Sequence, residues 1–124
     1  MEIIISNADG RPIYEQIAAQ IKSGVLAGAL TQGEALPSMR QLARDLRISV
    51  ITTKRAYEDL ERDGFVTNVP GKGCFVAAQN PELLREETLR RAEAALQSAV
   101  DAAQSGGVSL EELQETLALL YKGE

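Results

Sequence analysis

Residues 36–64 read LPSMRQLARDLRISVITTKRAYEDLERDG, and two helices begin and end within this stretch. Ser38 is followed three residues later by a glutamine, which is the spacing of a capping box at a helix N-terminus. Ser49 is a typical N-cap for a second helix, and Gly64 stands where glycine commonly ends one. The connection between the two helices is limited to residues 47–49. Two helices joined by so short a turn predict a helix-turn-helix.

Each of these two helices has one apolar side. The first carries Leu42, Ala43 and Leu46. The second carries Thr53, Ala56, Tyr57 and Leu60, at spacings of three, one and three residues. We therefore expect these sides to face the protein core and the opposite sides to face solvent.

The flanking segments extend the motif in both directions. Before it, Pro12 suits the first turn of a helix whose isoleucines and valine recur every four residues up to Val25. The run Ile3–Ile5 predicts an edge strand. After the motif, residues 65–67 and 74–76 predict two strands joined by a glycine-rich turn. Three helices followed by a hairpin predict a winged helix-turn-helix.

Two more helices follow the hairpin. Asn80 and Pro81 predict the start of a long fourth helix, which the run Ser105–Gly107 ends. Ser109, with a glutamate three residues later, caps a fifth helix. The predicted fold class is therefore mainly α with a small β-hairpin. We expect a winged helix-turn-helix DNA-binding domain in residues 1–78 and a two-helix dimerisation or regulatory domain in residues 79–124.

Apolar stripes on the last two helices predict a dimer. The first three helices and the hairpin already close one domain, so a surplus apolar stripe is expected to meet a partner. The spacing on the fourth helix resembles a heptad seam with small residues that permit close approach. The dimerisation residues that we predict are Leu89, Ala92, Leu96, Ala99, Ala103, Leu113, Leu117 and Leu120. The alternative is that the two helices fold back on the core of the same chain.

The composition argues against several classes of function. The chain has 124 residues, no histidine and a single cysteine, which removes the usual general base, the usual metal ligand and a disulfide framework. No nucleophile–base pair or metal cluster supports an enzyme, and we expect no cofactor and no metal. No apolar run is long enough to cross a membrane, and the N-terminus lacks a signal peptide pattern. We therefore expect a cytoplasmic protein with no membrane partner.

The net charge of −5 is distributed unevenly along the chain. Residues 36–79 hold seven basic and five acidic side chains, a local charge of +2. Residues 80–124 hold four basic and nine acidic side chains, a local charge of −5. This distribution allows a phosphate backbone to bind the middle of the chain while the acidic tail faces away.

The start of the second helix of the motif is the segment expected in a DNA major groove. Its candidate contact residues are Ser49, Ile51, Thr52, Lys54 and Arg55. Hydroxyl groups bond base edges or phosphates, a guanidinium bonds guanine through two hydrogen bonds, and Ile51 suits a thymine methyl group. The alternatives are that Val50 and Ile51 belong to the core, and that Lys54 and Arg55 are simply solvated.

Further candidates flank this helix. Ser38, Arg40 and Arg44 would lie beside a phosphate strand, where the free amides of a helix N-terminus also bind anions. The alternative for Arg44 is a local ion pair with a nearby acid. The hairpin tip, Gly71, Lys72 and Gly73, permits a close backbone approach and places a lysine near a phosphate or the minor groove.

Four segments together resemble the GntR family of bacterial transcription regulators. They are PIYEQI at 12–17, LPSMRQLA at 36–43, TTKRAYEDLERDG at 52–64 and GKGCFV at 71–76. The short tail resembles that of the YtrA-like subfamily, and it is too small for an aminotransferase-like domain, so pyridoxal phosphate is not expected. By position, the resemblance implies DNA contacts at Arg40, Thr52, Lys54, Arg55 and 71–73. The chain departs from the subfamily's pattern at residues 49–51 and 68–70.

The sequence thus predicts a sequence-specific DNA-binding regulator. The resemblance implies a repressor that binds a pseudo-palindromic operator in double-stranded DNA as a homodimer. An unknown small-molecule effector is a possible further partner, at the junction of the two domains or at the dimer interface. The alternative function is a winged-helix protein-interaction module that does not bind nucleic acid, which the acidic isoelectric point of about 4.8 favours slightly.

Overall fold

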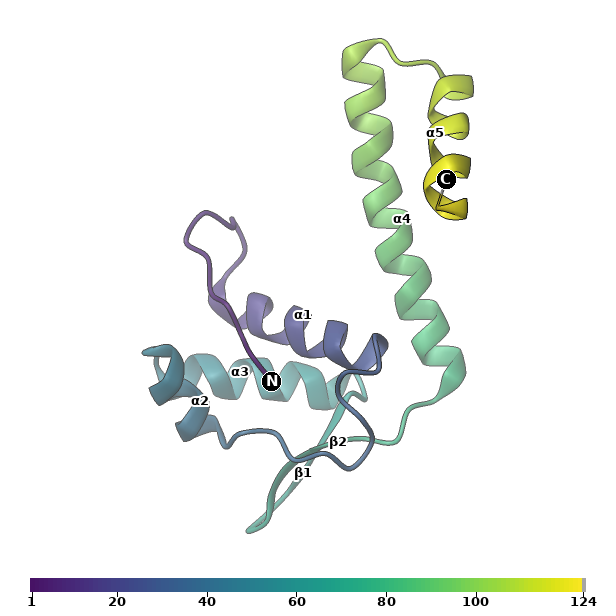
Figure 1. Ribbon diagram of the computed structural model, residues 1–124. Coiled ribbons are helices and arrows are strands. Elements are labelled where there is room, and N and C mark those ends of the chain that lie inside the picture. The colour runs from purple at the N-terminus through teal and green to yellow at the C-terminus, as the bar shows by residue number, and fades with distance from the viewer. Residues whose placement is uncertain (124) are drawn as a thin grey trace. The chain divides into compact units, whose positions relative to one another are not determined.

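The computed structural model describes residues 1–123, in one compact unit that ends at Pro81 and a second that begins at Glu82. The elements are α1 (Ile13–Leu26), α2 (Met39–Leu46), α3 (Val50–Arg62), β1 (Val66–Val69), β2 (Gly73–Val76), α4 (Pro81–Gly106) and α5 (Leu110–Lys122) (Figure 1). This order confirms the predicted fold class, a winged helix-turn-helix followed by two helices.

The turn between α2 and α3 forms as the sequence predicts. The hydroxyl of Ser38 accepts a hydrogen bond from the Gln41 amide at 3.1 Å, and the hydroxyl of Ser49 accepts one from the Thr52 amide at 3.2 Å. Arg47 ends α2 with a φ of 56°, in the left-handed region that non-glycine residues rarely adopt. Both predicted caps therefore exist, and the left-handed residue reverses the chain between them.

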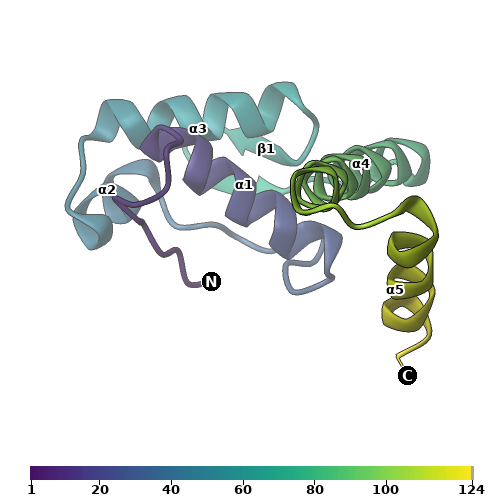
Figure 2. The same ribbon diagram turned by 90° about the horizontal axis from the view of Figure 1, so that it is seen from above.

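The core of the first unit lies between α1 and α3, which pack side by side (Figures 1 and 2). Ile17 and Ile21 of α1 and Ala56 and Leu60 of α3 have no exposed surface. Burying such side chains contributes about 1.5–3 kcal/mol for each large aliphatic residue. This packing fixes which side of α3 faces inward and leaves its other side in solvent.

The hairpin is attached to the segment before α2. β1 and β2 pair antiparallel, with Val66 opposite Val76, and Ala35 forms an additional bridge with Phe75. The Leu36 amide donates to the Cys74 carbonyl oxygen at 2.8 Å. The base of the wing and the entry to the helix-turn-helix are therefore held by the same backbone hydrogen bonds.

The predicted edge strand at Ile3–Ile5 is wrong. The Ile4 amide donates to Oε1 of Gln20 at 2.9 Å, and Nε2 of Gln20 donates back to the Ile4 carbonyl oxygen at 2.7 Å. Gln16 holds Ser6 in the same way, at 2.9 and 3.1 Å. Side-chain amides of α1 thus satisfy the backbone groups that a neighbouring strand would otherwise pair.

The second unit is a helical hairpin in which a short turn reverses the chain between α4 and α5 (Figure 1). Between them lies a groove of about 1070 Å³, lined mainly by alanine and leucine side chains. None of the helices in the described part of the chain is long and apolar enough to cross a membrane.

Candidate nucleic-acid interface

The first two turns of α3 present apolar and hydroxyl side chains to solvent. Ile51 is 81% exposed, and Val50 is exposed as well, so the alternative that they are core residues is wrong. The hydroxyl groups of Ser49 and Thr52 lie 2.8 Å apart at the start of the helix. This end of α3 therefore offers one methyl-bearing surface and two hydroxyl groups, which are the chemical groups that read base edges.

The Arg55 side chain is 56% exposed and is held by two side chains of the same unit. Its guanidinium carbon lies 4.3 Å from the centroid of the Tyr14 ring, and Nη2 donates to the Tyr14 hydroxyl at 3.4 Å. Nε lies 3.6 Å from a carboxylate oxygen of Asp59. Lys54, by contrast, has only an ion pair with Glu58 at 3.9 Å among residues 1–123, and exposed pairs of this kind contribute little.

Beside α3, α2 presents a row of basic residues. Arg40 and Arg44 are exposed, and neither pairs with an acidic side chain within residues 1–123. The predicted alternative of an ion pair for Arg44 is therefore not found in this part of the chain. Ser38 lies exposed at the N-terminus of the same helix, with its hydroxyl engaged as a cap.

Arg47 is a further basic residue of this surface that the sequence analysis did not assign. It is exposed in the turn between α2 and α3. The sequence could have indicated this role for Arg47, because it lies in a turn of only three residues. Every side chain of such a short turn lies near the start of the following helix.

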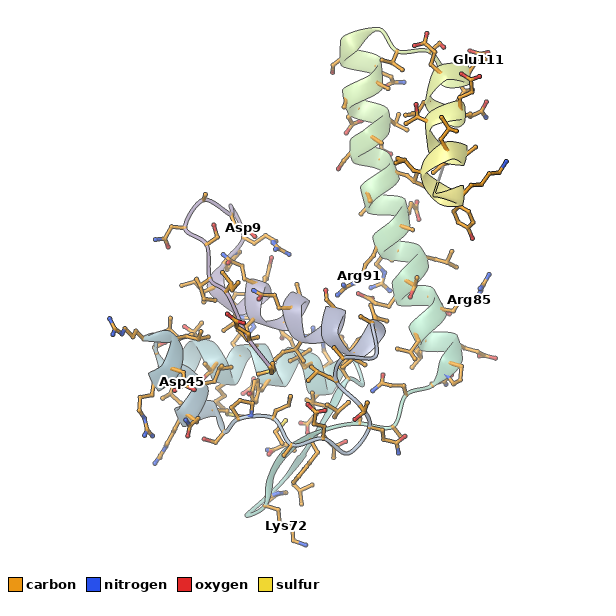
Figure 3. The ribbon with its side chains drawn as sticks, viewed as in Figure 1. Asp9, Asp45, Lys72, Arg85, Arg91 and Glu111 are labelled. Carbon is orange, nitrogen blue, oxygen red and sulfur yellow. The ribbon has the colours of Figure 1, made fainter. Side chains whose placement is uncertain are left out.

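The wing tip carries an exposed lysine on a tight turn. Lys72 projects from the end of the hairpin, away from the body of its unit (Figure 3). Gly71 has a φ of 77°, a backbone conformation that is strained for residues with a side chain. The Lys72 amide donates to the Val69 carbonyl oxygen at 2.9 Å. Gly73 is exposed at the start of β2. The turn thus positions the lysine by backbone geometry alone.

The predicted dimerisation residues differ in how exposed their side chains are. Ala103 is only 7% exposed within the single chain, and Ala99 and Leu113 are half-buried. The exposed members are Leu89, Ala92, Leu96, Leu117 and Leu120. The groove between α4 and α5 brings together most of these side chains and adds Tyr121, which the sequence analysis missed although it follows Leu117 by four residues.

Two titratable groups behind the site have pKa values that burial shifts. Burial raises the pKa of the Tyr57 hydroxyl and of the Cys74 thiol, and both side chains lie in the core behind the exposed surface. Within residues 1–123, no three histidine, cysteine or carboxylate side chains are placed to hold a metal ion.

Comparison with known proteins agrees with this geometry. The profile of bacterial regulatory proteins of the gntR family matches residues 13–76. The HTH-type transcriptional repressor YtrA of Bacillus subtilis is 34% identical over 113 residues, which are 91% of this chain and 87% of that protein. A transcriptional antiterminator structure from Listeria monocytogenes EGD-e is 33% identical, with a TM-score of 0.74 over 98% of this chain and 90% of that one.

A structure of the DNA-binding domain of AraR in complex with the operator ORE1 is also similar. It is 26% identical, with a TM-score of 0.52 over 62% of this chain and 94% of that one. These relatives are regulators of transcription rather than enzymes. The chain belongs to the GntR family of transcriptional regulators, and its first unit is the winged helix-turn-helix DNA-binding domain of that family.

Proposed function

We propose that this protein is a repressor that binds a two-fold symmetric operator as a homodimer, with α3 of each copy in a major groove. The exposure of Ile51 is the observation on which the proposal rests. If the first turn of α3 were buried, no surface would be left to contact bases. The YtrA relative is named a repressor, and the AraR relative has been solved on an operator, which supports the same role here.

Sequence would be read by the first turns of α3. Arg55 suits guanine, because its terminal nitrogens retain free N–H groups, and Ile51 suits a thymine methyl group. The hydroxyl groups of Ser49 and Thr52 suit base edges or the nearest phosphate.

Phosphates would be bound on either side of that groove. Arg40 and Arg44, without acidic partners in the described part of the chain, are available to one strand. The free backbone amides and the helix dipole at the start of α2 also favour binding of a phosphate on that strand. Lys72, on the wing tip, is available to the neighbouring minor groove or its backbone.

The second copy would be bound through the groove between α4 and α5. Leu96, Leu117 and Leu120 expose large apolar surfaces there. The exposed leucines of both helices form one apolar surface that a partner can cover. A dimer would place two recognition helices on half-sites about one helical turn, or about 34 Å, apart. Such a regulator acts in the cytoplasm, where bacterial DNA lies.

The test starts from the full-length protein and a random pool of double-stranded DNA. We expect several rounds of selection to enrich a two-fold symmetric sequence. Sedimentation should show two protein copies on each selected duplex, and a reporter gene placed behind that sequence should be transcribed less when the protein is present. A reporter that is unchanged or activated would contradict the repressor assignment.

The alternative of a protein-interaction module makes the opposite prediction. A pool that stays random after selection, together with no binding to heparin, would overturn DNA recognition, because a DNA-binding surface also binds polyanions. Enrichment of a sequence by a protein that sediments as a monomer at all concentrations would overturn the homodimer alone.

A further inference from the structure

The aromatic ring of Tyr14 lies beneath a side chain that the proposed function places on DNA. The guanidinium of Arg55 lies over this ring, with 4.3 Å between the guanidinium carbon and the ring centroid. Tyr14 belongs to α1, which does not contact DNA in the proposed arrangement, and it is half-buried against its own unit. The two residues are 41 positions apart in the chain, so the contact depends on the packing of α1 against α3.

The contacts of Arg55 leave three of its terminal N–H groups without a partner among residues 1–123. Nε faces Asp59 at 3.6 Å, and one N–H of Nη2 points to the Tyr14 hydroxyl at 3.4 Å. The second N–H of Nη2 and both N–H groups of Nη1 have no partner among residues 1–123. Two parallel hydrogen bonds to guanine need only these terminal groups.

Asp59 is itself fixed, so the contacts hold Arg55 from two directions. Its carboxylate accepts a hydrogen bond from Nη1 of Arg62 at 3.1 Å, and its side chain is only 17% exposed. A guanidinium that lies over a ring and has a carboxylate near Nε has fewer favourable positions than a free one. An arginine side chain that is ordered before binding loses less rotamer entropy when it meets a base.

We propose that Tyr14 is a specificity-determining positioning residue, which holds the Arg55 guanidinium in place for base recognition without touching DNA. This inference rests on the proposed function, because it requires Arg55 to read a base. It assigns to α1 a role in operator discrimination in addition to its role in the core.

Two substitutions separate the ring from the hydroxyl group. Tyr14→Leu removes the stacking surface, whereas Tyr14→Phe keeps the ring and removes only the hydroxyl. The measured quantity is the ratio of affinities for the duplex selected by the wild-type protein and for a scrambled duplex of equal composition. We expect Tyr14→Leu to lower this ratio about two- to fivefold, the range for an exposed cation–π contact, and Tyr14→Phe to leave it nearly unchanged.

The same substitutions in an Arg55→Ala background test the coupling. We expect Tyr14→Leu to have no further effect on the ratio there, because the guanidinium that it positions is gone. An equal loss in both backgrounds, or an equal loss of affinity for both duplexes, would overturn the proposal, since a merely structural role of Tyr14 would act in that way.

A measurement on the wild-type protein keeps the test independent of how the variants fold. Protons of the Arg55 side chain above an aromatic ring should resonate upfield of their usual NMR positions, and the shift should persist on the selected duplex. Normal resonance positions would overturn the inference. If Arg55→Ala binds the selected duplex as tightly as wild type, the base-reading role fails first, and the positioning role fails with it. If Arg55→Ala loses affinity and Tyr14→Leu does not, only the positioning role fails.

Discussion

The hydroxyl of Tyr57 donates a 2.7 Å hydrogen bond to the backbone carbonyl oxygen of Pro37. This bond joins the middle of α3 to the residue before the Ser38 cap. One turn earlier, the hydroxyl of Thr53 donates to the Met39 carbonyl oxygen at 3.0 Å. Two side chains of α3 thus bind the backbone at the start of α2, and together they fix the angle between the two helices of the motif.

Removing the Tyr57 hydroxyl should destabilise the first unit. Tyr57→Phe leaves the Pro37 carbonyl without this donor, and Tyr57 is only 2% exposed, so we expect a loss of about 1–3 kcal/mol in the free energy of unfolding. Urea unfolding followed by circular dichroism measures the change. Tyr14→Phe, which removes a tyrosine hydroxyl whose hydrogen bond from Arg55 is 3.4 Å long, is the control at equal protein concentration. Equal losses in the two variants would mean that the bond to Pro37 contributes nothing.

The same residue predicts a loss of stability in alkali. Burial raises the pKa of Tyr57 above its ordinary value near 10, so the folded protein keeps a proton that the unfolded chain releases. Stability from this group is complete below about pH 10 and falls as the pH rises further. Between about pH 9 and pH 11, wild type should therefore lose more unfolding free energy than Tyr57→Phe. Parallel losses would contradict the prediction.

Arg40 and Lys72 should contribute affinity without sequence preference. A cation that binds a phosphate releases a counterion, so we expect Arg40→Ala or Lys72→Ala to weaken binding to all duplexes similarly. Each should lower the slope of log affinity against log salt by about one. Fluorescence anisotropy at several salt concentrations measures both. Arg85→Ala, an exposed arginine of α4, is the control and should leave the slope unchanged. An unchanged slope for Arg40→Ala would remove Arg40 from the contact surface.

Arg55 should contribute affinity with sequence preference. We expect Arg55→Ala to weaken binding to the selected duplex by about 1–3 kcal/mol and to relax the preference at one base pair of each half-site. Repeating the selection with this variant identifies that base pair. A loss that is equal on every duplex would show that Arg55 binds a phosphate instead.

A charge in the groove of the second unit should separate the two copies. Leu96→Glu places a carboxylate on the apolar surface, where its desolvation without a partner costs several kcal/mol, so we expect the dimer dissociation constant to rise at least about tenfold. Ala94→Glu adds the same charge two residues away on the same helix, outside the residues that line the groove, and is the control. Sedimentation equilibrium distinguishes them, and equal masses for the two variants would contradict the proposed interface.

The elements of the fold are predictable because their signals are local. Ser38, Ser49 and Gly64 mark helix ends through bonds or backbone angles within a few residues, and the structure places helix boundaries beside each of them. The Ile3–Ile5 strand was wrong because Gln20 competes for the Ile4 backbone from another element, which no β-propensity records.

The candidate site was predictable in composition but not in arrangement. The exposure of Ile51 depends on which side of α3 packs on α1, and periodicity left that open. The stacking of Arg55 on Tyr14 joins residues 41 positions apart, so it has no sequence spacing to reveal it. In the tail, the regular seam placed Ala103 among the dimerisation residues, whereas this side chain is already buried within the single chain.

The bonds between Gln20 and Ile4 have a consequence for assembly. A run of isoleucines with unpaired backbone groups is a template to which a strand of another chain can add, and such additions propagate into fibres. The glutamine amide occupies both the donor and the acceptor of the central isoleucine. These two bonds thereby remove the backbone groups of Ile4 from any such addition.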